Sequence, residues 1–154
     1  MPKEQFLIAM RFLASSVSVI SAKDSFGSLF AMTASSVTSL TMDPPSILVC
    51  VNNGASIHDV LVKGENLCIN VLQKNQQEIS NLCSSRQLES KRFQNDCWDV
   101  VDIPFIKDAQ ANVFCKVDET VSYHTHKIVI ASVLRSQSAD TFNTLMYADG
   151  GYLD

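Results

Sequence analysis

The stretch ANVFCKVDETVSYHTHKIVIASVLR, residues 111–135, decides the fold of this chain. Apolar and polar residues alternate over 111–123 and again over 127–135, which is the period-2 pattern of β-strands. The two runs meet around the segment Tyr123-His124-Thr125-His126, so we expect them to form one long antiparallel hairpin. Such a hairpin favours a mainly antiparallel β fold.

Other strand-like and helix-like segments lie on both sides of this hairpin. We expect strands over 16–21 (half-buried), 29–40 (with an irregular end), 46–51 (buried on both faces), 67–72 and 145–147. We expect a helix packed on one side over 4–14, a short helix that a capping box at Ser56 opens and Gly64 closes, and a capped helix from Asn75 to about Ser84. Because βαβ alternation is absent, the prediction is a closed or split antiparallel barrel with a few short helices.

Composition narrows the class of protein. The 154 residues are 46% hydrophobic and 18% charged, with a net charge of −4, which predicts one domain over 1–154 and a homo-oligomer. No basic stripe is present to bind nucleic acid, and no apolar run is long enough to span a membrane. The first residues lack the pattern of a signal peptide, so the expected location is the cytoplasm. The five cysteines form no C-x-x-C motif and are expected to be core or surface thiols.

Two segments could hold a ligand, and each also has an ordinary structural interpretation. Asn52-Asn53-Gly54-Ala55-Ser56 leads from a strand into a helix, where free backbone N–H groups can hold a phosphate. The small residues of 31–37 would let a flat ring lie against the backbone. No G-x-G-x-x-G motif or P-loop is present. His124 and His126 share a strand face, but no third ligand stands at a familiar spacing, so no metal site is expected.

Taken in order, the motifs resemble one known family. They are AMRF at 9–12, VSVISA at 17–22, AMTASS at 31–36, SLTMDPP at 39–45, LVCVN at 48–52, INVL at 69–72, Arg92-Phe93 with Trp98, HKI at 126–128, and the segment from Tyr147 to Tyr152. The chain resembles the short-chain flavin reductases, which are the reductase components of two-component flavin-dependent monooxygenases. The resemblance covers about residues 6–152, and its most specific part runs from Met32 to Val51.

This resemblance implies an FMN-binding split barrel that works as a homodimer. Each subunit would hold FMN or FAD, accept hydride from NADH or NADPH, and release reduced flavin to a partner oxygenase. The residues implied for the isoalloxazine ring are Met32, Thr33, Ala34, Ser35 and Ser36. Those implied for the ribityl chain and phosphate are Cys50, Val51, Asn52, Asn53, Gly54, Ala55, Ser56 and Ile57, with Lys91 and Arg92 as added phosphate contacts. His126 matches the histidine of the catalytic site beside the nicotinamide, and Tyr152 matches an aromatic residue near the same pocket.

The chain departs from the family pattern at two places. His124-Thr125 stands where relatives commonly have Gly-Asp, and Ser16 stands where they have glycine after the first helix. Two other readings of the same barrel therefore stay open. One is a flavin-binding protein or carrier that does not use nicotinamide. The other is a protein that binds haem or another planar cofactor, with His58, His124 or His126 as an axial ligand.

Overall fold

Seven antiparallel strands form the main sheet of the computed structural model, which describes residues 1–154. In sheet order they are β3 (Leu29–Ala34), β2 (Ser18–Lys23), β6 (Asn66–Val71), β9 (Ala111–Tyr123), β10 (His126–Ser138), β5 (Pro45–Asn52) and β4 (Thr38–Met42). Strands β9 and β10 form the predicted hairpin, with Tyr123 opposite His126 and a two-residue turn between them. The expected mainly β, antiparallel architecture is confirmed.

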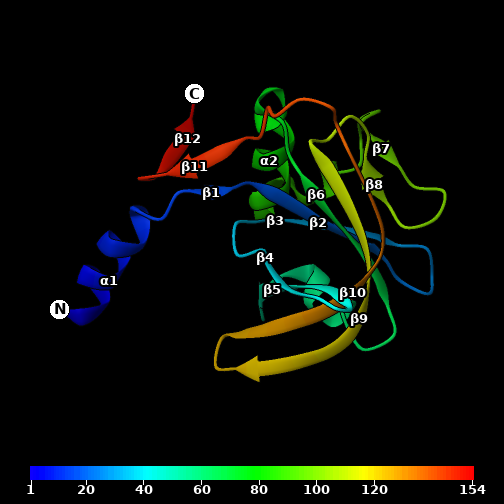
Figure 1. Cartoon of the computed structure of the whole chain (residues 1–154), viewed down its shortest axis with the longest axis horizontal. Coiled ribbons are helices and arrows are strands. Elements are labelled where there is room, and N and C mark those ends of the chain that lie inside the picture. The colour runs from blue at the N-terminus through cyan, green and yellow to red at the C-terminus, as the bar shows by residue number, and fades with distance from the viewer.

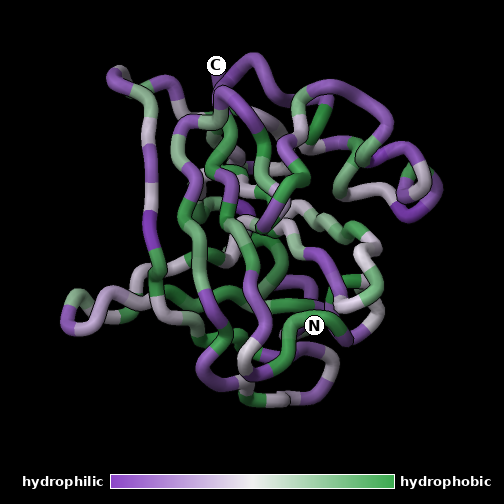
Figure 2. Tube along the Cα trace, turned by 90° about the vertical axis from the view of Figure 1, so that its right-hand side faces the viewer, coloured by the Kyte–Doolittle hydropathy of each residue, from purple (hydrophilic) through white to green (hydrophobic).

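The main sheet curls around one apolar core, as the ribbon shows (Figure 1). Inward-facing residues of six strands meet in this core, among them Ile20, Val51 and Val129. The edge strands β3 and β4 are not hydrogen-bonded to each other, so the barrel is split. A short 3-10 helix, η1 (Ser56–Asp59), follows β5, and the fully buried Ile57 and Leu61 from this region fill the core. Apolar residues accordingly run along the strands through the middle of the molecule (Figure 2).

A second apolar core lies on the outer face of β2 and β3. Helix α2 (Gln77–Ser84) packs there through Ile79 and Cys83, against Val19 of β2 and Ala31 of β3. The half-buried reading of 16–21 is therefore wrong, because β2 is covered on both faces and Ser18–Ala22 are all buried. Of the two buried serines of β2, Ser21 donates its hydroxyl to the Pro104 carbonyl, whereas the Ser18 hydroxyl has no hydrogen-bond partner.

Three other expectations differ from the structure in detail. The strand expected over 29–40 is two strands, β3 and β4, because the chain bends away after Ala34. The helix expected from Ser56 to Gly64 is only the four residues of η1, and its N-cap is Ala55 with no side-chain cap. The helix expected from Asn75 begins at Gln77, after the 3-10 turn η2 (Lys74–Gln76). The segment 85–110 forms another 3-10 helix, η3 (Arg86–Lys91), and the small hairpin β7 (Trp98–Asp99) and β8 (Phe105–Ile106).

The N-terminal helix α1 (Pro2–Arg11) projects away from the barrel (Figure 1). It was expected to pack on one side, yet it has no buried residue. Its only anchor to the body is near its end, where Arg11 pairs with Asp149 beside the small sheet β1 (Ser15–Ser16), β11 (Met146–Ala148) and β12 (Gly151–Leu153). No helix of the structure is long and apolar enough to cross a bilayer.

A buried amide, Asn70 of β6, connects the barrel to β8. Its Nδ2 donates to the carbonyl of Val19 at 2.8 Å and to the Ser21 hydroxyl at 3.0 Å. Its Oδ1 accepts from the Ile106 backbone N–H at 2.9 Å and from the Asn112 amide at 2.8 Å. Asn70 is fully buried, and each of its polar atoms has a partner, so the network fixes the register of β2, β6, β8 and β9.

Candidate functional site

Two neighbouring cavities open on the side of the barrel where β3, β5, α2 and η3 meet. The first has a volume of about 480 Å³ and is lined by Met32, Thr33, Asn52, Gly54, Ala55, Ser56, Cys83, Ser84, Arg86, Glu89 and Arg92. The second has a volume of about 420 Å³ and is lined by Val17, Thr33, Ala34, Ser35, Ser80, Asn81, Ser84, Tyr147, Gly150, Gly151 and Tyr152. Thr33 and Ser84 line both, so the two cavities adjoin. Each falls in the size range of small-molecule sites.

The turn from β5 into η1 forms one wall of the first cavity. Asn52 shapes this turn, since its Oδ1 accepts from the Gly54 N–H at 2.8 Å and its carbonyl accepts from the Ala55 N–H. The backbone N–H groups of Ser56 and Ile57 open η1 and have no partner within the helix by position. Because η1 has only four residues, an anion here would gain little from a helix dipole. The Ser56 hydroxyl and these two N–H groups are the donors that this wall offers.

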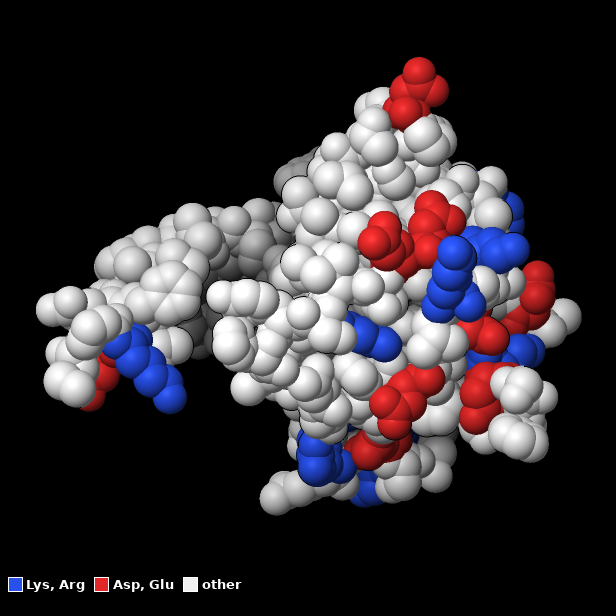
Figure 3. Space-filling view, turned by 90° about the horizontal axis from the view of Figure 1, so that it is seen from below, with Lys and Arg blue, Asp and Glu red and all other residues white.

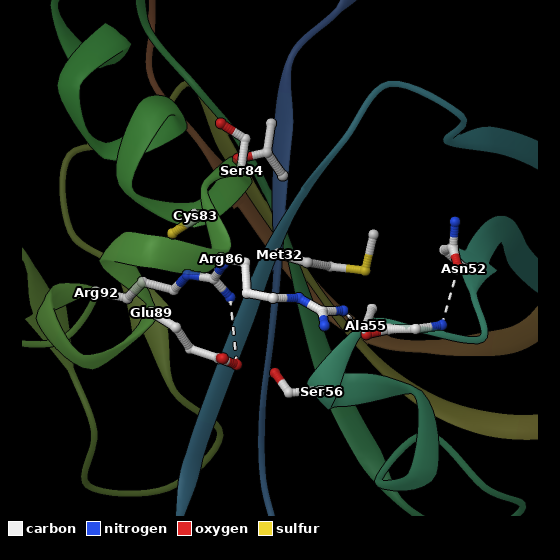
Figure 4. Close-up of a pocket in the computed structure, with 11 residues that line it drawn as sticks. Met32, Asn52, Ala55, Ser56, Cys83, Ser84, Arg86, Glu89 and Arg92 are labelled. Atoms are coloured by element: carbon white, nitrogen blue, oxygen red, sulfur yellow. Dashed lines mark hydrogen bonds and ion pairs between the residues drawn. The ribbon is translucent and has the colours of Figure 1, made fainter.

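The opposite wall carries a cation that the sequence analysis did not select. Arg86, the first residue of η3, extends across the cavity, and its Nη2 donates to the Gly54 carbonyl at 2.6 Å (Figure 4). A Cβ at position 54 would lie 3.4 Å from this nitrogen, so glycine leaves room for the arginine. The remaining N–H donors of the guanidinium are free to meet an anion beside Ser56.

Arg92 lines the same cavity, but most of its hydrogen bonds stabilise the fold. Its Nε, Nη1 and Nη2 donate to the carbonyls of Leu82, Ala31 and Ser85 at 3.0, 2.6 and 3.1 Å. The residue is buried, and it clamps β3, α2 and η3 together. Lys91, the other expected phosphate contact, is exposed and lines neither cavity.

The floor between the cavities comes from β3 and α2. Thr33 donates its hydroxyl to the Ser80 carbonyl at 2.7 Å, which holds β3 against α2. Cys83 also lines the first cavity, and burial raises the pKa of its thiol to about 12. A thiol with this pKa stays protonated near neutral pH, so Cys83 is not a nucleophile there.

Aromatic residues of the C-terminal hairpin form one side of the second cavity. The rings of Tyr147 and Tyr152 meet edge to face with centroids 5.4 Å apart. The Tyr152 hydroxyl bonds the Ser80 hydroxyl and Asn81 Oδ1, each at 2.8 Å. Tyr152 therefore has a fixed position, and its ring is available to a flat ligand lying near Thr33.

His126 lies at the rim of the first cavity, where it pairs with Asn52 across β5 and β10. It is exposed, and its Nδ1 lies 2.9 Å from the Thr125 hydroxyl. Asn53 docks the hairpin turn onto the first cavity by donating from Nδ2 to the His124 carbonyl and from its backbone N–H to the Thr125 carbonyl, both at 2.9 Å. His124 has φ +50°, so it adopts the left-handed conformation that glycine adopts freely. The backbone thus favours the glycine of the family pattern at this position, and His124 adopts the same left-handed conformation.

Lys127 supports the same wall from inside the barrel. Its Nζ donates to the carbonyls of His58 and Leu61 at 2.6 and 2.7 Å, which fixes the chain that follows Ser56. Burial lowers the pKa of Lys127, and the nearby Asp59 partly opposes this effect. No sequence pattern predicts this role of Lys127, because its contact with the His58 and Leu61 carbonyls depends on its inward position on β10.

The structure brings together some of the expected site residues and separates others. Those lining a cavity are Met32, Thr33, Ala34, Ser35, Asn52, Gly54, Ala55, Ser56, Arg92 and Tyr152. Those lining neither are Ser36, Cys50, Val51, Asn53, Ile57, Lys91 and His126. Val51 and Ile57 are core residues, and Ser36 exchanges hydrogen bonds with the Cys50 backbone at 3.2 Å. Within one subunit, Tyr152 lines the second cavity, whereas His126 lines neither.

The residues present fit a phosphorylated flat cofactor. The first cavity combines an arginine that has unused donors with a serine hydroxyl and backbone N–H groups. The adjoining cavity adds small β3 residues and an aromatic wall, which suit a ring. Neither cavity has a lining histidine, so His58, His124 and His126, the axial ligands that the haem alternative requires, line neither.

Known proteins resemble the chain in sequence and in structure. The model of the flavin reductase like domain matches residues 10–154. The FMN reductase (NADH) RutF of Pseudomonas syringae pv. syringae is 34% identical over 144 residues, which is 92% of this chain and 80% of that protein. The reductase component of the FADH(2)-dependent resorcinol hydroxylase of Rhizobium sp. is 32% identical and covers 79% of this chain and 69% of that protein. The styrene monooxygenase flavin reductase of Pseudomonas putida S12 superposes with a TM-score of 0.83 at 26% identity, covering 97% of this chain and 96% of that one.

Proposed function

The chain belongs to the flavin reductase like domain family, and on that premise we propose that residues 1–154 form one NAD(P)H-dependent flavin reductase domain. The enzyme reduces FMN, with FAD as a second option, using NADH or NADPH, and it supplies reduced flavin to a partner monooxygenase. Relatives named as FMN reductase (NADH) and as a reductase component support this activity. The observation that carries the proposal for this chain is the first cavity, where Arg86 faces Ser56 beside Met32 and Thr33 of β3.

Each wall of the site has a distinct task in this proposal. Ser56, the adjacent backbone N–H groups and Arg86 hold the phosphate, with Arg92 fixing the η3 segment that carries Arg86. Met32 to Ser35 lie along the ring, and Tyr152 supplies an aromatic wall. When bound, the flavin accepts hydride from the nicotinamide, a chemistry that needs stacking and no protein nucleophile. His126 positions the nicotinamide nucleotide at the rim of the site.

A direct test measures NADH consumption in air with and without added FMN. The proposal predicts that the rate of consumption rises in proportion to the protein concentration and saturates with FMN and with NADH. A rate that does not change when FMN is added would contradict it. A repeat with NADPH and FAD identifies the preferred pair.

Replacing His126 with alanine should reduce NADH-dependent flavin reduction by roughly tenfold to a hundredfold, because one contact that orients the nicotinamide is lost. FMN affinity should stay nearly unchanged, since His126 does not line either cavity. Rapid mixing of each FMN complex with NADH measures the reduction step, and flavin fluorescence measures affinity. The matched control is His124→Gly, which keeps the left-handed turn that His124 adopts at φ +50°. A larger defect in the control than in His126→Ala would overturn the assignment of His126.

We also propose that the protein is a homodimer in which α1 packs on a second copy. Phe6, Leu7, Ile8, Phe12 and Leu13 of this region are each more than half exposed. The projecting helix is mostly free of charged side chains in the space-filling view (Figure 3). A monomer rarely leaves so large an apolar surface in water.

Strands β4 and β5 add to this unpartnered surface. The apolar run 46–51 was expected to be buried on both faces, but Leu48 and Cys50 are only partly covered within one subunit. Every residue of the neighbouring β4 is exposed, including Met42, which is 80% exposed. A second subunit would supply the missing cover.

Introducing glutamate at both Phe6 and Met10 should shift the protein toward monomer, because these residues lie one helical turn apart and would bury two charges. Sedimentation at low micromolar concentration measures the mass. Lys3→Glu is the matched control, since it also changes the net charge by −2 on the same helix and removes no apolar group. A wild-type monomer that still binds flavin would contradict the dimer.

The thiols support a cytoplasmic location, which we propose for the enzyme. All five cysteines are free, and three of them are buried. Unpaired cysteines are typical of the reducing compartment in which NADH is available.

A further inference from the structure

Three charged side chains repeat at intervals of three along η3 and its C-cap. Arg86, Glu89 and Arg92 all line the first cavity. A 3-10 helix has three residues per turn, so side chains at i and i+3 lie directly above one another. The sequence RQLESKR therefore places alternating positive, negative and positive groups on one face. In Figure 4 Arg86 extends toward Ala55, and Arg92 lies beside Glu89.

The carboxylate of Glu89 lies among the groups that would attract a phosphate. Its Oε1 is 3.8 Å from Nη1 of Arg92, and its side chain is 44% exposed. Arg92 does not depend on it for hydrogen bonding, because three backbone carbonyls already accept from that guanidinium. Glu89 thus reduces the positive charge of the cavity from two arginines to a net of one.

We propose that Glu89 limits the affinity of this enzyme for the flavin phosphate, so that reduced FMN leaves readily. A phosphate monoester carries nearly two negative charges near neutral pH, and a carboxylate in the same cavity repels it. The remaining positive charge of the cavity still favours the binding of FMN over that of a flavin without a phosphate. This inference rests on the proposed function, since release of the product matters only to an enzyme that hands its flavin on.

The test compares Glu89→Gln with the wild type by fluorescence titration of FMN and of riboflavin, which lacks the phosphate. We expect Glu89→Gln to bind FMN about tenfold more tightly at low salt, with a correspondingly slower dissociation rate, and the gain to shrink as salt increases. Riboflavin affinity should stay unchanged and also reports that the variant is folded. Glu78→Gln is the control. Glu78 is an exposed residue of α2 that does not line this cavity, so its replacement removes the same charge at a different place.

Each outcome separates this inference from the proposed function. FMN affinity that is unchanged or weaker in Glu89→Gln, while the wild type binds and reduces FMN, overturns the role of Glu89 and leaves the reductase standing. An equal gain for riboflavin, or an equal gain in Glu78→Gln, also overturns it. A wild type that binds neither flavin overturns both.

Discussion

Replacing Arg86 with alanine is expected to weaken FMN binding about a hundredfold while riboflavin binding changes by less than about twofold. Arg86 has more free donors than Arg92, because its only partner in the structure is the Gly54 carbonyl, whereas three of the five N–H groups of Arg92 donate to backbone carbonyls. A charge-assisted bond to the phosphate is therefore lost, whereas the ring contacts along β3 remain. Parallel fluorescence titrations of the two flavins measure the difference.

Lys91→Ala is the matched control for this prediction. Lys91 has the same charge and belongs to the same helix η3, but it is exposed and lines neither cavity. Its replacement should leave the affinity for both flavins unchanged. A greater loss of FMN affinity in Lys91→Ala than in Arg86→Ala would mean that the phosphate lies on the other side of η3. An equal loss of FMN and riboflavin in Arg86→Ala would mean that Arg86 only supports the fold.

Replacing Asn70 with valine is expected to lower the free energy of unfolding by about 3 kcal/mol. Valine suits a strand, so the change isolates the loss of the buried amide. The Ile106 N–H would keep no acceptor, and the Val19 carbonyl and the Ser21 hydroxyl would each lose a donor. Urea unfolding with an unchanged slope measures the effect.

Asn66→Val tests whether this loss comes from the network. Asn66 lies on the same strand β6 but is exposed, so its replacement should change stability by less than about 0.5 kcal/mol. Similar losses in the two variants would contradict the special role of Asn70.

The long hairpin was predictable because local pattern determines it. Alternation over 111–135 reflects a sheet with one covered face, and β9 and β10 follow it closely. The burial of β2 was not predictable in this way, since helix α2 covers its second face from a distant part of the chain. The exposure of α1 is the opposite case, because its apolar residues have no partner within one subunit.

In the candidate site, too, the features set by local sequence were predictable and those set by tertiary packing were not. The Met32–Ser35 and Asn52–Ser56 segments come to line the adjoining cavities because each follows or belongs to a core strand. Arg86 and Glu89 were missed because a spacing of three becomes one face only in a 3-10 helix, and nothing in the local sequence distinguishes η3 from an irregular loop. Arg92 lies in the cavity, but its contacts with carbonyls of β3 and α2 depend on tertiary packing.

The most direct measurement of the central claim is the absorbance of the FMN-loaded protein after mixing with NADH under argon. The account predicts that the absorption band of oxidised flavin bleaches rapidly and returns when air is admitted. An oxidised spectrum that persists in the presence of NADH and NADPH would contradict a reductase. It would indicate instead a flavin-binding protein that does not use nicotinamide.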